Sequence, residues 1–488
     1  MQIEDMLFPL LKTYIAAPQW VKSWIGHTYR ALPVSMRRGK HYPAFARELA
    51  AHRDEVSIRR LSDRKLAATL KLAIETVPAY QKHQNLLKFL HGGKNVDTVL
   101  LDIPPVSKEE IRSDVERFVS TSLPRSHRLE VSTGGSTADP LYFYLQKGVT
   151  RPKEYAFMDD FLSRVGLRPD DVILSLQGRK VPTAGEENGR KWMYEPIKRH
   201  LIISSDHLEE RYMPQHLEAL RQWRPSYIQA YPSLLYLLAR WLHENPQPNI
   251  IQHIKGVIIY SENLYEFQRR LIESVFDCPV LTHYGHSERV LMAASLPGDP
   301  RFFFWPQYGK FELLDPDGNP ITQPCVLGEI VGTSFDNQVM PFVRYRTGDF
   351  ALLSDHPHPD LPLYPVCERI EARIQEFLVC KDHRLISVST LGLARFDDIN
   401  DIQTMQYEQD EPGRVVMKVV STTPLTASQT EKLAQAVREK TQGGCTVEVR
   451  PVDQLPRTPR GKHKMLIQHL DISHYIRESR ERLQSIGV

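Results

Sequence analysis

The chain has 488 residues, of which 41% are hydrophobic and 25% are charged. This composition is ordinary for a folded globular protein, and it excludes a disordered, collagen-like or coiled-coil chain. The length predicts about two to four structural units. The 62 basic residues nearly balance the 59 acidic ones, giving a net charge of +3, so nothing in the charge calls for a nucleic-acid partner.

The cysteines and the apolar runs bear on the cell compartment. Five cysteines are widely spaced without a CxxC pair, so we expect neither a zinc site nor a disulfide framework. No apolar run reaches the ~18–20 residues of a membrane helix, and the acidic start at Glu4 and Asp5 argues against a secretory signal. We therefore expect a cytoplasmic protein. The segment from Met6 to Trp24 fits either an interfacial helix or a helix packed on its own domain, and we favour the second.

The N-terminal hundred residues are predicted to be helical. Leu66, Leu70 and Ile74 recur at helical spacing in a helix predicted over 62–77, with Ser62 as its N-cap and Pro78 ending it. From about residue 129 the pattern becomes mixed. Strand-like runs at 172–174 and 256–260 alternate with helical stretches at 233–243 and 264–276. This alternation favours a mostly parallel sheet covered by helices.

A boundary is predicted near 355–375, where the segment 355–362 is polar and rich in proline. Beyond it, strands at 415–420 and 446–449 flank a helix over 426–440, with Ser428 and Glu431 as a candidate capping box. The predicted fold class is α/β. A large N-terminal region of several α/β subdomains spans 1–372, with its helical part at 1–100, and a small mobile α+β domain spans 373–488.

The first candidate site is a loop rich in small and hydroxyl-bearing residues. It contains Ser132, Thr133, Gly134, Gly135, Ser136 and Thr137. Such a loop can present N–H and O–H donors to a phosphate, because its glycines let the backbone approach closely. It lacks the GxxxxGK[ST] pattern and joins two strand-like segments. A hairpin loop without a ligand fits the same residues.

Three further stretches carry residues suited to nucleotide chemistry. Glu288 ends the stretch Tyr284–Glu288 after a strand-like run, and one carboxylate in that position can hold Mg²⁺. Asp349 follows a Thr-Gly turn and can accept hydrogen bonds from a ribose diol, whereas Arg344 and Arg346 also fit alternate positions on one strand face. Lys462 follows a turn rich in proline and glycine; alone it is typical of an exposed surface.

The chain resembles the adenylate-forming superfamily over nearly its whole length. The resemblance is carried by four motifs in this order: the Gly/Ser/Thr loop, YGxSE, YRTGD and RTxxGK. The closer resemblance is to its phenylacetate–CoA ligase branch, including the CapK-like proteins found with polysaccharide gene sets. Three more stretches carry that resemblance, namely Val77–Tyr80, Leu101–Lys108 and Tyr260–Leu264.

The resemblance implies activation of a carboxylic acid by ATP to an acyl- or aryl-adenylate, followed by transfer to coenzyme A. Transfer to an amine, an amino sugar or a carrier protein is the alternative, and a non-catalytic nucleotide-binding relative is a third reading. It further implies that the loop from Ser132 to Thr137 holds the triphosphate, that Glu288 binds Mg²⁺ and that Lys462 bridges the carboxylate and the α-phosphate. The other nucleotide contacts it implies are Ser261, Glu262, Tyr284 near the adenine, Gly285, Ser287, and Asp349 with Arg373 at the ribose.

Two departures from the family pattern concern the loop and the hinge. Ala138 stands where relatives usually have glycine. The usual Gly-Arg-x-Asp hinge is replaced by Ala372-Arg373-Ile374-Gln375, and an acidic residue, Glu376, comes one place later than the usual aspartate. The second change raises the question whether the C-terminal domain rotates for transfer to coenzyme A. Candidates for the acid pocket, by position only, are Trp192, Tyr194, Tyr231 and His283. The identity of the acid stays open, as does the oligomeric state, a homodimer included.

Overall fold

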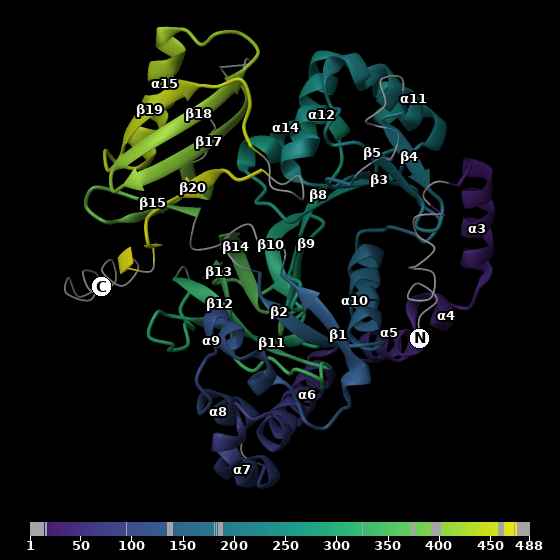
Figure 1. The fold of residues 1–488 in the computed structure, drawn as a ribbon, viewed down its shortest axis with the longest axis vertical. Coiled ribbons are helices and arrows are strands. Elements are labelled where there is room, and N and C mark those ends of the chain that lie inside the picture. Colours follow the sequence, from purple (N-terminus) through teal and green to yellow (C-terminus); the bar gives the residue numbers. More distant parts are fainter. Residues whose placement is uncertain are drawn as a thin grey trace. The chain divides into compact units, whose positions relative to one another are not determined.

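The computed structural model describes residues 14, 17–93, 95–133, 140–179, 181, 183, 189–324, 326–371, 376–391, 402–456, 463–472 and 474–475. The chain forms two compact units, each assembled from separate segments (Figure 1). Unit 1 takes its residues from 1–171, 194–200 and 281–370, and unit 2 from 172–193, 201–280 and 371–488. The predicted division between residues 372 and 373 stays a prediction.

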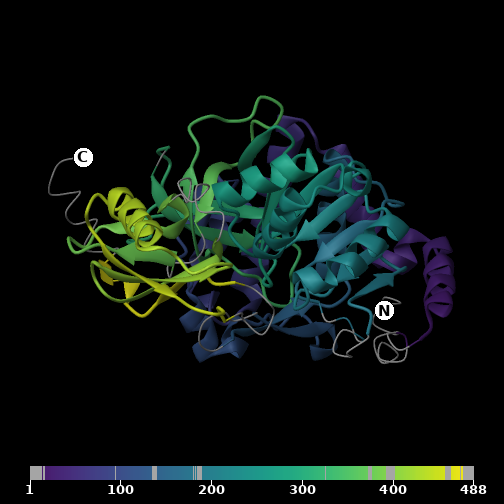
Figure 2. The same ribbon diagram turned by 90° about the horizontal axis from the view of Figure 1, so that it is seen from above.

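Unit 1 begins with a series of helices (Figures 1 and 2). The described helices are α3 (Gln19–Ala31), α4 (Val34–Arg38), α5 (Tyr42–Ala51), α6 (Glu55–Thr76), α7 (Leu87–His91), α8 (Val96–Leu101), α9 (Lys108–Ser113) and α10 (Thr150–Arg164). The predicted start of α6 is wrong. It begins at Glu55 because Asp54 caps it, accepting a hydrogen bond from the Ser57 amide at 2.9 Å, and Ser62 lies inside the helix.

The strands of unit 1 form a hairpin and one run of a sheet. They are β1 (Arg128–Ser132), β2 (Tyr142–Gln146), β8 (Val280–Gly285), β9 (Met292–Leu296), β10 (Asp299–Phe304), β11 (Gly309–Leu314), β12 (Leu327–Ser334), β13 (Tyr345–Leu353) and β14 (Val366–Glu371). The sheet order is β11-β12-β13-β14-β10-β9-β8. The pairs β11·β12, β12·β13, β10·β14, β9·β10 and β8·β9 are antiparallel, so the expectation of a mostly parallel sheet is wrong for this unit.

The core of unit 1 joins its helices to this sheet. Leu70 and Ile74 of α6 are fully buried in one apolar cluster with Leu313 of β11 and Tyr345 of β13. The helical stripe seen in the sequence therefore shares a core with β13, the strand that carries the YRTGD stretch. Burial of such side chains stabilises the fold by about 1.5–3 kcal/mol each.

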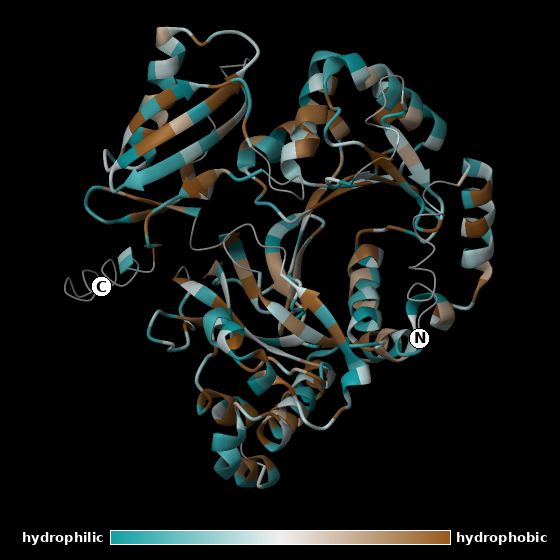
Figure 3. Cartoon of the chain, viewed as in Figure 1, coloured by the Kyte–Doolittle hydropathy of each residue, from teal (hydrophilic) through white to brown (hydrophobic). Residues whose placement is uncertain are grey.

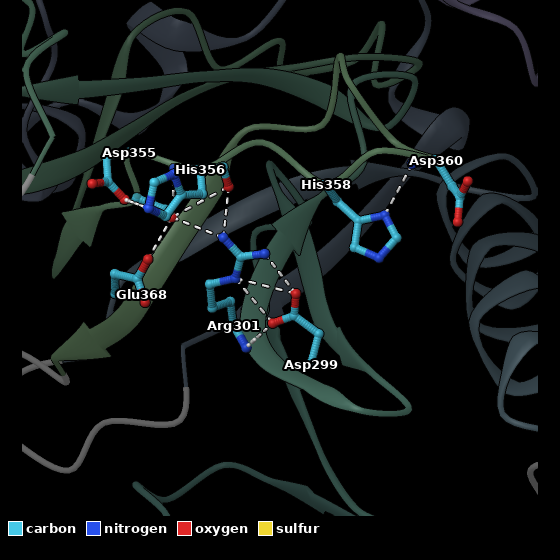
Figure 4. A network of polar contacts seen from close by, with 8 residues as sticks. Asp299, Arg301, Asp355, His356, His358, Asp360 and Glu368 are labelled. Atoms are coloured by element: carbon cyan, nitrogen blue, oxygen red, sulfur yellow. Dashed lines mark hydrogen bonds and ion pairs between the residues drawn. The ribbon is translucent and has the colours of Figure 1, made fainter.

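The proline-rich segment 355–362 is a loop of unit 1 between β13 and β14. Arg301 of β10 fastens it: Nη1 donates to the Ser354 hydroxyl at 3.0 Å and to the His356 carbonyl at 2.6 Å (Figure 4). The same guanidinium pairs with Asp299 at 2.6 Å. The segment thus joins two strands of one sheet rather than two units.

We expect Arg301→Ala to lower the free energy of unfolding by about 1–3 kcal/mol at neutral pH, because it removes hydrogen bonds to a charged group. Hydrogen bonding to Arg301 lowers the pKa of Asp299 below its ordinary value. The stabilisation from the ion pair between Arg301 and Asp299 is therefore complete above about pH 4, where Asp299 is ionised, and it is lost as the pH falls further. Denaturant unfolding of both proteins at pH 7 and pH 3 measures it.

A matched control is Arg211→Ala, which removes an exposed ion pair to Glu209 with the same sequence spacing. It should change the free energy of unfolding by less than about 1 kcal/mol. An equal loss in both variants, or a loss at Arg301 that does not shrink in acid, would contradict this role of Arg301.

Unit 2 contains a parallel run of strands and the C-terminal segment. Its first part has the order β7-β6-β3-β5, and β3·β6 and β6·β7 pair in parallel, as the sequence predicted for this region. The elements are β3 (Ile173–Leu176), β5 (His200–Ile203), α11 (Met213–Trp223), β6 (Tyr227–Ala230), α12 (Pro232–Glu244), α13 (Pro248–Ile251), β7 (Gly256–Tyr260) and α14 (Glu266–Phe276). Strand β4 (Trp192–Glu195) is shared between the two units.

The C-terminal part of unit 2 is α+β, as predicted. Strands β15 (Phe377–Val379) and β16 (Leu385–Ser387) pair, and β17 (Ile402–Glu411), β18 (Arg414–Ser421), β19 (Thr446–Pro451) and β20 (Leu466–Gln468) form a sheet with α15 (Ala427–Lys440). Apolar residues recur along β18 (Figure 3). The capping box of α15 is Thr426 with Gln429, so the predicted pair Ser428 and Glu431 is wrong. Among the described residues, no helix is long and apolar enough to cross a membrane.

Candidate active site

Three separate stretches of unit 1 meet around the carboxylate of Glu288, which is 3% exposed. Tyr345, the first residue of β13, donates its hydroxyl to Glu288 Oε1 at 2.5 Å. Lys108 Nζ lies 3.9 Å from the same oxygen, and His286 Nδ1 lies 3.5 Å from Oε2. The structure therefore gathers groups from 101–108, 284–288 and 341–349 at one buried anion.

Local structure fixes the position of Lys108. It is the first residue of α9, whose capping box pairs Ser107 with Glu110. Two backbone hydrogen bonds of 2.9 Å join Val106 to the start of β13. The Val106 amide donates to the Arg344 carbonyl, and the Arg346 amide donates to the Val106 carbonyl. Lys108 Nζ donates to the Thr347 carbonyl at 2.6 Å. In the sequence, Lys108 stands out only as part of the family resemblance; its place directly after the N-cap Ser107 is a further signal for a positioned cation.

Asp349 lies within β13, at a bulge. Glu329 and Val331 of β12 pair with Phe350 and Arg346, so the β13 segment has two extra residues there. Gly348 adopts φ +77°, a conformation that suits glycine at a bulge. The Asp349 carboxylate accepts a hydrogen bond of 2.8 Å from the Tyr284 hydroxyl, which ties the YGxSE and YRTGD stretches together.

Charge in this cluster is set by burial and by the neighbours. Burial raises the pKa of the Glu288 carboxyl, but hydrogen bonding and charge from His286, the Lys108 ammonium and the Tyr345 hydroxyl outweigh it, lowering the pKa to about 2. Burial, followed by the nearby carboxylates, raises the pKa of Tyr284 and Tyr345 well above the ordinary value. At neutral pH both tyrosines are therefore hydrogen-bond donors and Glu288 is an anion.

The two arginines of the YRTGD region make structural ion pairs. Arg344, with φ +48°, pairs with Glu312 at 2.9 Å and donates to the Ile103 carbonyl at 2.8 Å. Arg346 pairs with Glu329 at 2.9 Å. Both guanidiniums are thus engaged with carboxylates of the same sheet, Glu312 on β11 and Glu329 on β12. Because Arg344 precedes β13 and has a positive φ, the expectation that the two arginines alternate on one strand face is wrong.

The Gly/Ser/Thr loop connects β1 and β2, which pair as an antiparallel hairpin, as predicted. At its ends, the Thr133 amide donates to the Leu141 carbonyl, and the Leu141 amide donates to the Thr133 hydroxyl, both at 2.9 Å. Ser132 is the last residue of β1. Gly134, Gly135, Ser136 and Thr137 lie outside the described residues.

Of the predicted site residues of unit 2, the structure describes Ser261 and Glu262. Ser261, with φ +69°, directly follows β7. Glu262 Oε1 accepts a hydrogen bond of 2.7 Å from the His463 amide, and Oε2 accepts one of 3.2 Å from the Ser233 amide. Lys462 itself and Arg373 lie outside the described residues. Glu262 therefore holds the backbone of the residue that follows Lys462.

The hinge departure has a counterpart in unit 2. Asn263, next to Glu262, donates to Glu376 Oε2 at 2.8 Å. Glu376, the acidic residue one place later than the usual hinge aspartate, therefore accepts a hydrogen bond from the stretch Tyr260–Leu264, which resembles the family. Residues 372–375 lie outside the described residues. The four aromatic or imidazole candidates for the acid pocket divide between the units: Tyr194 and His283 belong to unit 1, Trp192 and Tyr231 to unit 2.

The residues around Glu288 fit a magnesium ion that arrives with phosphates. No group of three or more His, Cys, Asp or Glu side chains that could hold a metal exists among the described residues. Mg²⁺ usually takes only one or two protein carboxylates and completes its octahedron with water and phosphate oxygens. Glu288 supplies one such carboxylate. His286 Nδ1 lies beside it at 3.5 Å, whereas His286 Nε2 has no hydrogen-bond partner in the described part of the chain.

The chain is similar to known proteins over much of its length. Residues 378–469 match the family described as the CapK C-terminal domain. Protein CapK of Staphylococcus aureus is 22% identical over 90% of this chain and 94% of its own length. The phenylacetate-coenzyme A ligase of Pseudomonas putida is 25% identical over 61% of this chain and 67% of its own.

Solved structures show the same fold. A crystal structure of 2-hydroxyisobutyryl-CoA ligase, in the postadenylation state in complex with R3-HIB-AMP, aligns with a TM-score of 0.62 at 16% identity. The alignment covers 87% of this chain and 91% of that one. The predicted fold class is confirmed, and so is the resemblance to the adenylate-forming superfamily and its CapK and phenylacetate–CoA ligase branch.

Proposed function

We propose that this protein is an AMP-forming ligase that activates a carboxylic acid with ATP. The convergence of Lys108, Glu288 and Asp349 in unit 1 carries the proposal, because three motifs that are far apart in the sequence build one charged cluster. The likeness to adenylate-forming ligases supports it. The product would be an acyl- or aryl-adenylate.

In this reaction an oxygen of the acid attacks the α-phosphorus of ATP. The bond between the α-phosphorus and the bridging oxygen breaks, and pyrophosphate leaves with that electron pair. The carboxylate approaches an α-phosphate that is itself anionic. Because negative charge accumulates in the transition state, catalysis depends on positioned cations. We assign this task to Lys462, whose compact ammonium on a flexible stem suits a point contact to an anionic oxygen.

The remaining residues would bind and orient ATP. Asp349 with Arg373 would hold the ribose hydroxyls, Tyr284 would lie near the adenine, and the loop from Ser132 to Thr137 would donate to the triphosphate. Ser261, Gly285 and Ser287 would add contacts to the nucleotide, whereas Glu262 would position the segment after Lys462. Glu288 would hold Mg²⁺, which neutralises phosphate charge when bound.

Two candidate functions share this first step and differ in the molecule that accepts the acyl group. Coenzyme A is the first choice, supported by the names of the phenylacetate-coenzyme A ligase and of the structural neighbour. An amine, an amino sugar or a carrier protein is the alternative. The match to CapK over 90% of the chain supports it, as does the unusual hinge sequence.

ATP–pyrophosphate exchange with a panel of aryl, fatty and amino acids tests the first half-reaction. We expect exchange that requires Mg²⁺ and one class of acid. Tight ATP binding without exchange for any acid would contradict the proposal and support a non-catalytic nucleotide-binding protein. With the acid known, product analysis separates the acceptors: a thioester formed only with coenzyme A indicates a CoA ligase, whereas an amide formed without coenzyme A indicates the alternative.

A further inference from the structure

Helix α3 is held to unit 1 by one face. Gln19 Nε2 donates to the Tyr194 carbonyl at 3.3 Å, and Arg30 Nη1 donates to the Pro196 carbonyl at 2.5 Å. Between them, Gly26 packs so closely that a Cβ there would lie 2.7 Å from Pro196. Figures 1 and 2 both show α3 at the outer edge of its unit. The helix is therefore fixed, and its orientation is defined.

Another face of α3 presents two tryptophans to solvent. Trp20 is 75% exposed and Trp24 is 67% exposed, and the i, i+4 spacing places them side by side on the helix. The next helix, α4, adds the exposed side chains of Val34 and Met36. Large apolar surfaces of this kind mark interaction sites, because isolated proteins rarely leave neighbouring aromatic residues in water.

The positive charge of residues 14–47 favours an anionic partner. Residues 14–47 contain Lys22, Arg30, Arg37, Arg38, Lys40 and Arg47, and no aspartate or glutamate. The acidic groups packed against it are already engaged: Glu195 accepts from the Tyr14 hydroxyl at 2.7 Å, and Asp159 from the Tyr42 hydroxyl at 2.8 Å. The exposed cations Lys40 and Arg47 have no ion pair with any described residue.

We propose that the α3–α4 face, formed by Trp20, Trp24, Val34 and Met36, docks on a bilayer surface that carries anionic phospholipids. Tryptophan suits the boundary between headgroups and acyl chains, because its ring is apolar and its indole N–H stays hydrogen-bonded. The exposed cations of the same stretch, Lys40 and Arg47, would be drawn to lipid phosphates. This attachment is peripheral, and it is independent of the ligase activity proposed above.

Cosedimentation of the full-length protein with vesicles tests the proposal. We expect binding to vesicles of phosphatidylcholine mixed with phosphatidylglycerol, weaker binding to phosphatidylcholine alone, and a loss of binding at high salt. Trp20→Ser combined with Trp24→Ser should reduce the partition coefficient at least about tenfold. The double variant should retain ATP–pyrophosphate exchange, since both side chains lie in solvent.

A matched control removes two exposed apolar residues from elsewhere in unit 1, namely Val56→Ser with Leu101→Ser. It should bind vesicles as the unchanged protein does. The unchanged protein staying in the supernatant with anionic vesicles would overturn the proposal, as would equal binding by the tryptophan double variant. Sedimentation velocity without lipid that shows a dimer, dissolved by the tryptophan changes, would also overturn it in favour of a second copy of this chain.

Discussion

Lys462→Ala should reduce acid-dependent ATP–pyrophosphate exchange by about 10²–10³-fold or more, while ATP still binds. The reason is the charge that develops when an acid oxygen approaches an anionic α-phosphorus. Removal of one preorganised donor at such a position typically costs about 10²–10³ in rate. Because the lysine is expected to act mainly in the transition state, kcat should fall far more than the KM for ATP rises.

Lys464→Ala is the matched control for this change, two residues further along the same segment. The Lys464 carbonyl accepts a hydrogen bond of 2.9 Å from Gln406, and this backbone contact survives the substitution. We expect exchange close to that of the unchanged protein. Unchanged exchange in Lys462→Ala would remove the role assigned to that residue. Equal losses in both variants would instead indicate that the segment is needed only for its structure.

The sequence predicted local elements well and long-range pairing poorly. The stripe of Leu66, Leu70 and Ile74 indicated a helix, and that helix exists, but its start shifted because Asp54 is an N-cap that apolar periodicity does not reveal. The runs at 172–174 and 256–260 are strands. Their parallel pairing, however, does not extend to β8–β14, since strand direction depends on connections rather than on residue pattern.

The same limit applies to the site. The order of four motifs led to Glu288 and Asp349, because a motif is a local feature of the chain. The contacts of Tyr345 and Lys108 with Glu288 could not be predicted from the sequence, because they arise only when β13 and α9 lie beside the end of β8. Each unit is also assembled from segments that are far apart in the chain, so no change of composition along the sequence could mark their limits.

Glu288→Gln should lower exchange by about 10²–10³-fold and raise the Mg²⁺ concentration needed for half-maximal rate. The amide keeps an oxygen that can accept the Tyr345 hydrogen bond, so the packing of this buried residue should survive. What is lost is the negative charge. Since the pKa of Glu288 is lowered to about 2, the carboxylate stays ionised throughout the pH range of an activity assay, and its protonation cannot cause an acid limb above about pH 4.

Glu329→Gln provides the comparison, because Glu329 is a carboxylate of the same unit that pairs with Arg346 at 2.9 Å. It should lower the free energy of unfolding and leave the Mg²⁺ requirement unchanged, since nothing places it on the nucleotide. If both variants shift the Mg²⁺ requirement equally, the effect belongs to the charge of the strand region as a whole. If only Glu288→Gln shifts it, the cluster of Glu288, Lys108 and Tyr345 acts as the metal-facing part of the site, and Lys108 then balances the carboxylate until the ion arrives.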